Sequence, residues 1–332
     1  MMWRRGTLAP LLVALTALLV ACSSPAAPAP PAAADDGFPV TITHAYGETV
    51  VPARPQRVVA LGYGDIAIAH AVGAPLVGAL QNNTGDPNLP YVQPPLPADV
   101  LGIEFADTVN LEEVASYRPD LILGVTSPVI LDQQTYEQLS AIAPTVVYAE
   151  ELFGASMQDD ARQIGRALGA EEQVEELITA AESRIAQVRG ELPGLEGKTY
   201  LFGQARGEVL PMVVGEQNLS TVFMRSLGLR VPDEFANAPA NSVLAPGTVG
   251  VSYEQVGMLD GADALFMTFA GPGDREQFEG NALVQQLRPV REGTYLPLTL
   301  DQAVALQAPN VVNVDWLLEQ LRPTLEKVAA ER

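Results

Sequence analysis

The segment between Gly169 and Gly190 carries a helical pattern that no proline interrupts, and it constrains the fold more than any other segment. Its apolar residues recur every three or four positions, which places them on one face of an α-helix. Glutamates open the segment and arginines close it, as the helix dipole favours. About 20 residues at 1.5 Å each give a rod of roughly 30 Å. Similar lengths of chain with mixed strand and helix patterns flank it. We therefore predict an α/β protein with two lobes joined by a single long helix at 169–192.

The first 21 residues have the pattern of a targeting segment. Arg4 and Arg5 precede an apolar run, Leu8 to Val20, which is short for a membrane span. Small residues then lead to Cys22, an arrangement that resembles the lipobox of bacterial lipoproteins. The resemblance implies cleavage before Cys22 and lipidation of its thiol at the extracytoplasmic face of a bacterial cell membrane. The alternative is an ordinary secreted protein with an incidental cysteine. Because the chain has a single cysteine, we expect no internal disulfide.

Residues 22–37 are dominated by alanine and proline and show no periodicity. Such a composition cannot bury a core, so it predicts a semi-extended tether between the membrane and a folded body. The rest of the chain, about 300 residues, exceeds the usual size of a single core, which agrees with two lobes. We predict an N-terminal lobe at 38–168 and a C-terminal lobe at 193–332, with no second membrane segment.

Acidic residues outnumber basic ones by 40 to 19, so the formal net charge is −21. A body this acidic argues against nucleic-acid binding and does not attract anionic ligands in general. An anionic ligand would therefore need a local basic pocket. Solubility is the simpler alternative explanation for the acidity.

Strand-like and helical segments alternate along the first lobe, which predicts a mainly parallel sheet. Strands are predicted at 40–44, 49–51, 57–61, 75–80, 120–124 and 145–148, and helices at 66–72, 111–117 and 132–141. The long polar segment from Gln81 to Asp99 is predicted to be a functional loop. The second lobe repeats this plan, with strands at 199–202, 209–214, 262–267 and 293–298 and helices at 219–227, 253–259 and 315–330.

Two segments, one in each lobe, echo each other. In each, a cap residue is followed two positions later by a glutamate, then by a short helix, an aspartate and a strand. The cap and glutamate are Asn110 and Glu112 in the first lobe, and Ser252 and Glu254 in the second. The echo indicates two related lobes.

Several segments together resemble the ABC-transporter substrate-binding lipoproteins that capture ferric siderophores, haem or vitamin B12. They are residues 43–47 with 55–61, 109–112 with 118–122, 139–146 and 251–255. The resemblance covers about residues 38–325 and implies a class III periplasmic-binding-protein-like fold, with two lobes bridged by one long helix. It implies a monomer without a cofactor that captures an iron(III)-siderophore complex between its lobes. Delivery would be to an ABC permease dimer and its ATPase for iron uptake. Haem, another iron complex, or reuse of the fold as an envelope sensor or scaffold are the alternatives.

In open α/β sheets, ligands lie outside the carboxyl ends of the strands, and this rule nominates loops in both lobes. In the first lobe these loops hold Tyr63, Asp65, Gln81, Asn82, Asn83, Thr126 and Ser127, and in the second Gln204, Arg206, Phe269 and Arg275. Members of the resembled family commonly grip iron-siderophores with arginines and aromatic rings, which implies Arg206 and Arg275. The alternative is that either arginine pairs with a nearby acid, such as Glu208 or Asp274. Trp316 is a further ligand candidate, although its helical spacing also suits packing.

Other functions find less support in the sequence. The chain has two histidines, His44 and His70, placed far from any shared cluster, whereas zinc sites need three or four nitrogen or sulfur ligands. We therefore predict no transition-metal site. No nucleophile elbow, dinucleotide fingerprint or phosphate loop occurs, so we predict that the protein is not an enzyme. Hydroxamate, catecholate and citrate-type siderophores stay open. The scarcity of cationic candidates favours a hydroxamate or mixed type.

The resemblance also implies a docking role for the two echoed glutamates. In the family, the glutamates that match Glu112 and Glu254 lie on the outer face of each lobe and meet arginines of the two permease subunits. The local alternative is that each glutamate only completes the start of its helix.

Overall fold

In the computed structural model, the described residues are 37–104, 106, 108–239 and 247–330, and they belong to one compact unit. The predicted targeting segment, Cys22 and nearly all of the predicted tether lie outside these residues. No helix among the described residues combines the length and the apolar character that a membrane span requires.

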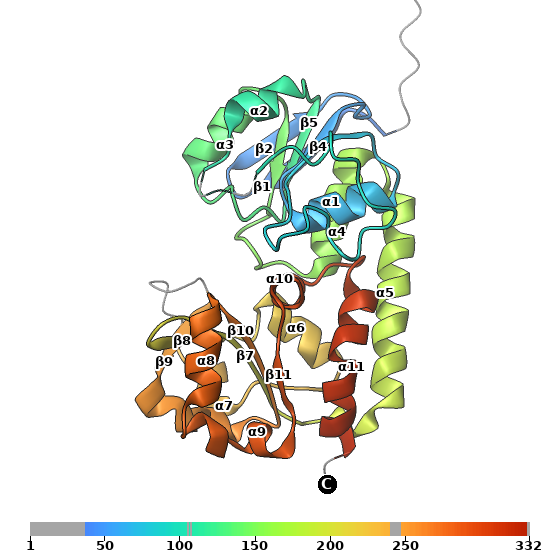
Figure 1. The fold of residues 1–332 in the computed structure, drawn as a ribbon. Coiled ribbons are helices and arrows are strands. Elements are labelled where there is room, and N and C mark those ends of the chain that lie inside the picture. Colours follow the sequence, from blue (N-terminus) through green and yellow to red (C-terminus); the bar gives the residue numbers. More distant parts are fainter. Residues whose placement is uncertain (1–36, 105, 107, 240–246, 331–332) are drawn as a thin grey trace, which may run out of the picture. The chain divides into compact units, whose positions relative to one another are not determined.

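The first lobe combines an antiparallel hairpin, a parallel sheet and helices (Figure 1). Its elements are β1 (Val40–His44), β2 (Gly47–Val51), β3 (Val58–Ala60), α1 (Tyr63–Ala71), β4 (Leu76–Ala79), α2 (Leu111–Ser116), β5 (Leu121–Gly124), α3 (Gln133–Ser140), β6 (Thr145–Val147) and α4 (Met157–Leu168). The sheet has the order β4-β3-β5-β6, and each neighbouring pair is parallel, as predicted. The strands β3, β5 and β6 are buried throughout, as expected of short β-branched runs in a parallel sheet.

The long helix α5 (Glu171–Glu191) confirms the predicted connection between the lobes. Its buried face consists of Val174, Ile178, Ala181, Ile185 and Val188, which follow the helical spacing. It packs against α4 of the first lobe and against helices of the second lobe, and Figure 1 shows it running beside α4 and the C-terminal helix.

The second lobe contains a five-stranded sheet in the order β11-β10-β7-β8-β9. Its elements are the 3-10 turn η1 (Pro193–Leu195), β7 (Tyr200–Ala205), β8 (Val209–Val213), α6 (Leu219–Ser226), α7 (Asp233–Ala236), β9 (Thr248–Ser252), η2 (Tyr253–Gly261), β10 (Ala264–Phe269), α8 (Pro272–Gly280), η3 (Val284–Gln286), α9 (Arg288–Glu292), β11 (Tyr295–Pro297), α10 (Leu300–Gln307) and α11 (Val314–Ala330). Strands β7, β10 and β11 are parallel, whereas β8 and β9 are antiparallel to their neighbours. A connection as short as 206–208 permits only a hairpin, because parallel strands need a crossover.

Several sequence predictions need correction. Helix α1 begins at Tyr63 rather than at residue 66, and the segment predicted as an α-helix at 253–259 is the 3-10 helix η2. Helices α4, α7, α8, α9 and α10 were not predicted. Helix α4 does carry a helical signal, because Met157, Ala161 and Ile164 are buried on one face and the Ser156 hydroxyl caps its start.

Candidate functional site

In the first lobe, two of the predicted ligand residues form a closed network where β3 and β5 end. The Asp65 carboxylate is fully buried and accepts hydrogen bonds from the backbone N–H groups of Val125 and Thr126, both at 3.0 Å. It also accepts one from the Thr126 hydroxyl at 3.0 Å. The Thr126 hydroxyl oxygen in turn accepts from the backbone N–H of Gly64 at 3.0 Å. Burial raises the pKa of Asp65 to about 6, and these hydrogen bonds oppose the rise.

This network leaves no room for a side chain at Gly62, in the turn before α1. A Cβ atom on Gly62 would lie 2.1 Å from the Asp65 carboxylate and 2.4 Å from the Thr126 hydroxyl. Ser127 is also buried, and its hydroxyl oxygen lies 3.4 Å from the backbone nitrogen of Val129. The structure therefore places Asp65, Thr126 and Ser127 inside the lobe, where their contacts hold the strand ends in position.

A second network joins the loop after β4 to the second lobe. The Asn82 side-chain amide donates to the Asp301 carboxylate at 2.8 Å, and the Thr84 hydroxyl donates to the same oxygen at 2.8 Å. The Tyr63 hydroxyl accepts from the backbone N–H of Asn83 at 3.3 Å. Burial raises the pKa of Tyr63 to about 12, and the negative charge of Asp301 adds to the rise.

Asp301 was missed by the sequence analysis. It lies in the first turn of α10, whose start is fixed by a capping box between Thr299 and Gln302. That capping box is a local signal for the helix, but 219 residues separate Asn82 from Asp301 and no sequence pattern links them.

In the second lobe, a small cavity of about 110 Å³ lies between the sheet and α10. Gln204, one of the predicted ligand residues, lines it together with Thr248, Thr268 and Gln307, while apolar side chains form the rest. The lining therefore offers hydroxyl and amide groups for hydrogen bonding.

A larger cavity of about 390 Å³ is lined by residues of both lobes. It is lined by residues 151–154, which follow β6 in the first lobe, and by residues 214–218 and Gly247 of the second. Phe153 in this lining has a φ of 63°, a left-handed conformation that residues with a side chain rarely adopt. Such outliers gather at functional sites, so Phe153 is a candidate that the sequence did not reveal.

The two cavities adjoin each other. Val213 and Thr248 line the smaller cavity, while their chain neighbours Val214 and Gly247 line the larger one. The backbone N–H of Val214 donates to the Gly247 carbonyl at 2.9 Å, which holds these segments side by side. We refer to the two cavities and the Asn82–Asp301 network as the inter-lobe site.

The predicted arginines lie elsewhere in the second lobe. Arg206 is exposed in the turn between β7 and β8, and Arg275 is exposed on α8. Arg275 pairs with Glu279 at 3.0 Å, and its guanidinium carbon lies 5.8 Å from the centre of the Phe269 ring. Neither arginine lines the two adjoining cavities.

The alternative, that an arginine pairs with a nearby acid, is confirmed for Arg275, whose partner is Glu279 rather than Glu208 or Asp274. The Asp274 carboxylate accepts instead from the backbone N–H of Gly207 at 2.7 Å, and the Glu208 carboxylate accepts from Gln277 at 3.2 Å. These two contacts fasten the β7–β8 turn to α8.

Trp316 is partly buried on α11, and its ring centre lies 5.8 Å from that of Tyr91. Because Tyr91 belongs to the segment between β4 and α2, this pair is a second contact between that segment and the C-terminal elements. Trp316 lines neither of the adjoining cavities.

The two echoed glutamates are both exposed and form no salt bridge with other described residues. The predicted cap at Asn110 is confirmed, because its side chain accepts from the backbone N–H of Glu113 at 3.2 Å. Ser252 does occupy the N-cap position of η2, but its side chain accepts no backbone N–H and bonds instead to the Gln255 side chain at 3.3 Å. Glu112 therefore lies in the first turn of a capped α-helix, whereas Glu254 lies in the first turn of a 3-10 helix.

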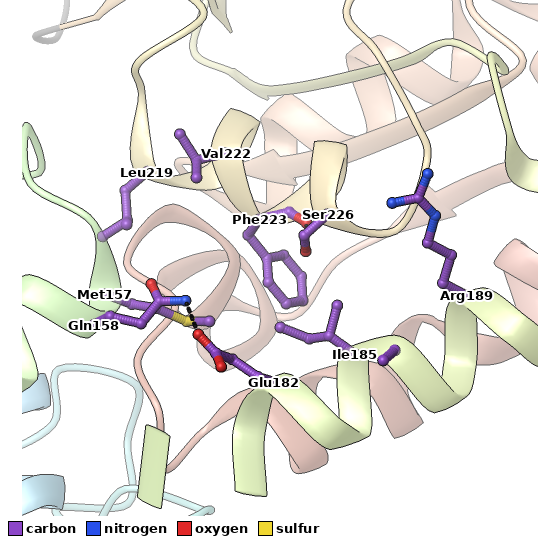
Figure 2. A pocket seen from close by; sticks show the side chains of 10 residues that line it. Met157, Gln158, Glu182, Ile185, Arg189, Leu219, Val222, Phe223 and Ser226 are labelled. Carbon is purple, nitrogen blue, oxygen red and sulfur yellow. Dashed lines mark hydrogen bonds between the residues drawn. The ribbon is translucent and has the colours of Figure 1, made fainter. Parts of the chain in front are cut away.

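A third cavity of about 300 Å³ lies between α4, α5 and α6 (Figure 2). Ile185, Leu219 and Phe223 give it a largely apolar lining, and a hydrogen bond of 3.1 Å joins Gln158 to Glu182 at its edge. None of the predicted ligand residues lines it. Within the described residues, no group of three or more His, Cys, Asp or Glu side chains is placed to hold a metal ion.

A family model described as periplasmic binding protein matches residues 58–259. The Bacillus subtilis protein named probable siderophore-binding lipoprotein YfiY is 25% identical over 294 residues, which cover 85% of this chain and 86% of that protein. The Fe(3+)-citrate-binding protein YfmC of the same bacterium is 26% identical over 250 residues, 74% of each chain.

Among solved structures, a periplasmic solute binding protein from Mycobacterium smegmatis is similar to this chain, with 28% identity and a TM-score of 0.73. The match covers 89% of this chain and 100% of that structure. The predicted fold, with two α/β lobes joined by one long helix, is thereby confirmed.

Proposed function

Because this chain belongs to the periplasmic binding protein family, we propose that it captures a ferric siderophore between its lobes and delivers it to an ABC permease for iron uptake. The observation that carries this proposal is the pair of adjoining cavities, one of which is lined by loops of both lobes. A ligand held there would contact both lobes at once. The names of YfiY and YfmC, which refer to a siderophore and to ferric citrate, support an iron complex as the ligand.

We propose roles for the predicted site residues according to their surroundings. Gln204 is placed to contact the ligand directly because it lines a cavity. Tyr63, Asn82 and Asn83 shape the first-lobe side of the site. Asp65, Thr126 and Ser127 act as positioning residues, since their polar groups are buried in internal contacts. A ligand role for Arg206, Phe269, Arg275 and Trp316 stays a prediction.

Capture can be tested by fluorescence. The chain has two tryptophans, and the proposed removal of the targeting segment would leave Trp316 alone. We expect a ferric siderophore to quench its emission at micromolar concentration or below, because the ring lies beside Tyr91 in the first-lobe segment between β4 and α2. Free zinc is the control and should not quench. A full panel of ferric siderophores and haem without any response would contradict the proposal.

We further propose that the protein is a lipid-anchored monomer on the extracytoplasmic face of the membrane, without enzymatic activity or a resident cofactor. The anchor would be the lipidated thiol of Cys22. Glu112 and Glu254 would each meet a basic pocket of the permease dimer, which works with its ATPase. Exposed interface charges mainly set the encounter rate and the orientation of binding.

Delivery can be tested separately from capture. We expect Glu112→Ala and Glu254→Ala to leave ligand affinity and melting temperature nearly unchanged, because both side chains are exposed and unpaired in the described structure. Uptake of labelled iron by cells should fall in each variant and fall further in the double variant. Glu176→Ala, an exposed glutamate on α5, is the matched control. Normal uptake by a well-expressed double variant would contradict the docking role.

A further inference from the structure

The inter-lobe site has an unusual charge balance for a site that would hold an anion. Among the described residues that line its two cavities, the charged side chains are Glu151 and Glu216, and neither lysine nor arginine occurs. Asp301 adds a third carboxylate in the Asn82–Asp301 network.

The arginines of the second lobe near these carboxylates line neither cavity. Arg225 on α6 donates to the backbone carbonyl of Glu216 at 3.3 Å. Arg275 is paired with Glu279, so its charge is already balanced. Arg206 is exposed in the turn between β7 and β8 and lines neither cavity. The protein as a whole carries a formal charge of −21, so its long-range field also repels anions.

One hydrogen-bond acceptor in the Asn82–Asp301 network has no partner within the described part of the chain. The Asn82 side chain is 6% exposed, and its Oδ1 atom is buried without a hydrogen-bond partner among the described residues. The side-chain nitrogen of Asn82 is already used, because it donates to Thr84 and Asp301 at 2.7 and 2.8 Å. The group without a partner in this network is therefore an acceptor, and Asn82 itself lines neither cavity.

The charge of a ferric complex follows from its chelating groups. Three hydroxamates, each carrying one negative charge, neutralise iron(III) and leave a neutral complex, which becomes cationic when the siderophore has a free ammonium group. Three catecholates carry two charges each and leave a complex with three negative charges, and citrate complexes are also anionic. An anion that binds among carboxylates costs free energy twice, because it loses its hydration and because their negative charges repel it.

We propose that the inter-lobe site selects ferric hydroxamate complexes of neutral or positive charge, with Glu151 and Glu216 as the residues that favour a cation and exclude anionic catecholate and citrate complexes. This inference rests on the proposed function, because it concerns the ligand of the same site. The amide group of Gln204 and the hydroxyl group of Thr268 supply the uncharged contacts for the body of the complex.

The test compares ferric complexes of different charge on the full chain, purified in detergent. The probes are ferrioxamine B, which carries an ammonium group, neutral ferrichrome, ferric enterobactin and ferric dicitrate, each labelled with radioactive iron for equilibrium dialysis. We expect ferrioxamine B and ferrichrome to bind at least about tenfold more tightly than the two anions. Added salt should weaken ferrioxamine B and leave ferrichrome unchanged.

Charge-removing variants identify the residues responsible. Glu151→Gln and Glu216→Gln should each weaken ferrioxamine B by about fivefold, the effect of one unit charge at contact distance in water. Ferrichrome should bind them as it binds the wild type. Because both glutamates are exposed, the variants should fold normally. Glu176→Gln removes the same charge from α5 and is the matched control for a change in net charge.

The outcomes separate this inference from the proposed function. If ferric enterobactin or ferric dicitrate binds as tightly as the hydroxamates, the charge selection is wrong while ferric-siderophore capture stands. If Glu151→Gln and Glu216→Gln behave like Glu176→Gln, these carboxylates do not select the ligand and the inference is overturned. If no ferric complex binds, the proposed function itself fails.

Discussion

Two polar side chains near the carboxyl ends of the strands are buried in the first lobe, whereas two in the second lobe are exposed. In the first lobe, Asp65 and Thr126 are buried and bond to each other and to the backbone. In the second lobe, Arg206 and Arg275 are exposed, and Arg275 pairs at the surface with Glu279. In the first lobe, β3 is followed at once by α1, and the side chain of Asp65 in α1 bonds to residues that follow the neighbouring strand β5. In the second lobe, β7 and β8 form a hairpin, and its turn exposes Arg206 to solvent.

This difference shows that the strand-end rule locates an edge of a sheet but does not assign a role to each side chain there. A buried, fully bonded carboxylate supports the site, whereas an exposed arginine contributes little to the fold. Three substitutions measure how large the difference is.

The largest effect is expected for Asp160, a buried carboxyl group on α4 of the first lobe that receives no hydrogen bond from any described residue. Burial raises its pKa to about 8, and the negative charges of Asp65 and Asp159 add to the rise. The unfolded chain releases this proton near pH 4, so the folded state holds a proton that the unfolded chain has lost between about pH 4 and 8. The free energy of unfolding should therefore fall as the pH rises through this window.

Asp160→Asn removes the free-energy cost of holding an ionisable carboxyl group in this buried position. We expect it to raise the free energy of unfolding at pH 8 by on the order of 4 kcal/mol and to flatten the pH dependence. Urea unfolding at several pH values measures both. Asp159→Asn, an exposed neighbour on the same turn, is the control and should change stability by less than about 1 kcal/mol. Identical pH profiles for Asp160→Asn and the wild type would show that Asp160 is ionised without cost.

The second effect concerns Asp65, whose carboxylate accepts three hydrogen bonds. Asp65→Ala leaves two backbone N–H groups and the Thr126 hydroxyl buried without this acceptor. Each such group costs about 1–3 kcal/mol, so we expect the free energy of unfolding to fall by about 3 kcal/mol or more. Urea unfolding at neutral pH is the measurement. A loss below about 1 kcal/mol would mean that water or another group replaces the carboxylate.

The smallest effect is expected in the second lobe. Arg275 and Glu279 are four residues apart on α8, with half or more of the arginine side chain exposed to solvent (53%). Pairs of this kind contribute about 0.3–0.5 kcal/mol, so Arg275→Ala should reduce stability by no more than about 0.5 kcal/mol. Glu279→Ala should lose somewhat more, because the Glu279 carboxylate also accepts a hydrogen bond from the Tyr295 hydroxyl at 3.1 Å, and the double variant should show little loss beyond that. A reduction above about 1.5 kcal/mol would make the surface of α8 as important to the fold as the buried network of Asp65.

Much of the fold follows from local patterns. The apolar spacing from Val174 to Val188 is sufficient to predict α5, and the alternation of strands and helices is sufficient to predict the parallel sheet of the first lobe. The antiparallel pairing of β8 with β7 was also foreseeable, because residues 206–208 are too few for a crossover. Helix α4 carried the same kind of periodic signal and was overlooked.

By itself, the sequence determined which loops would gather at the ends of the strands, since a strand and the residues after it are neighbours in the chain. Only the tertiary structure decided what each side chain does there. Asp65 finds its partners 60 and 61 residues away, and Asn82 finds Asp301 at a separation of 219. Periodicity reports the burial of a face within one element, whereas a hydrogen-bond partner or the charge of a cavity depends on which elements the folded chain brings into contact.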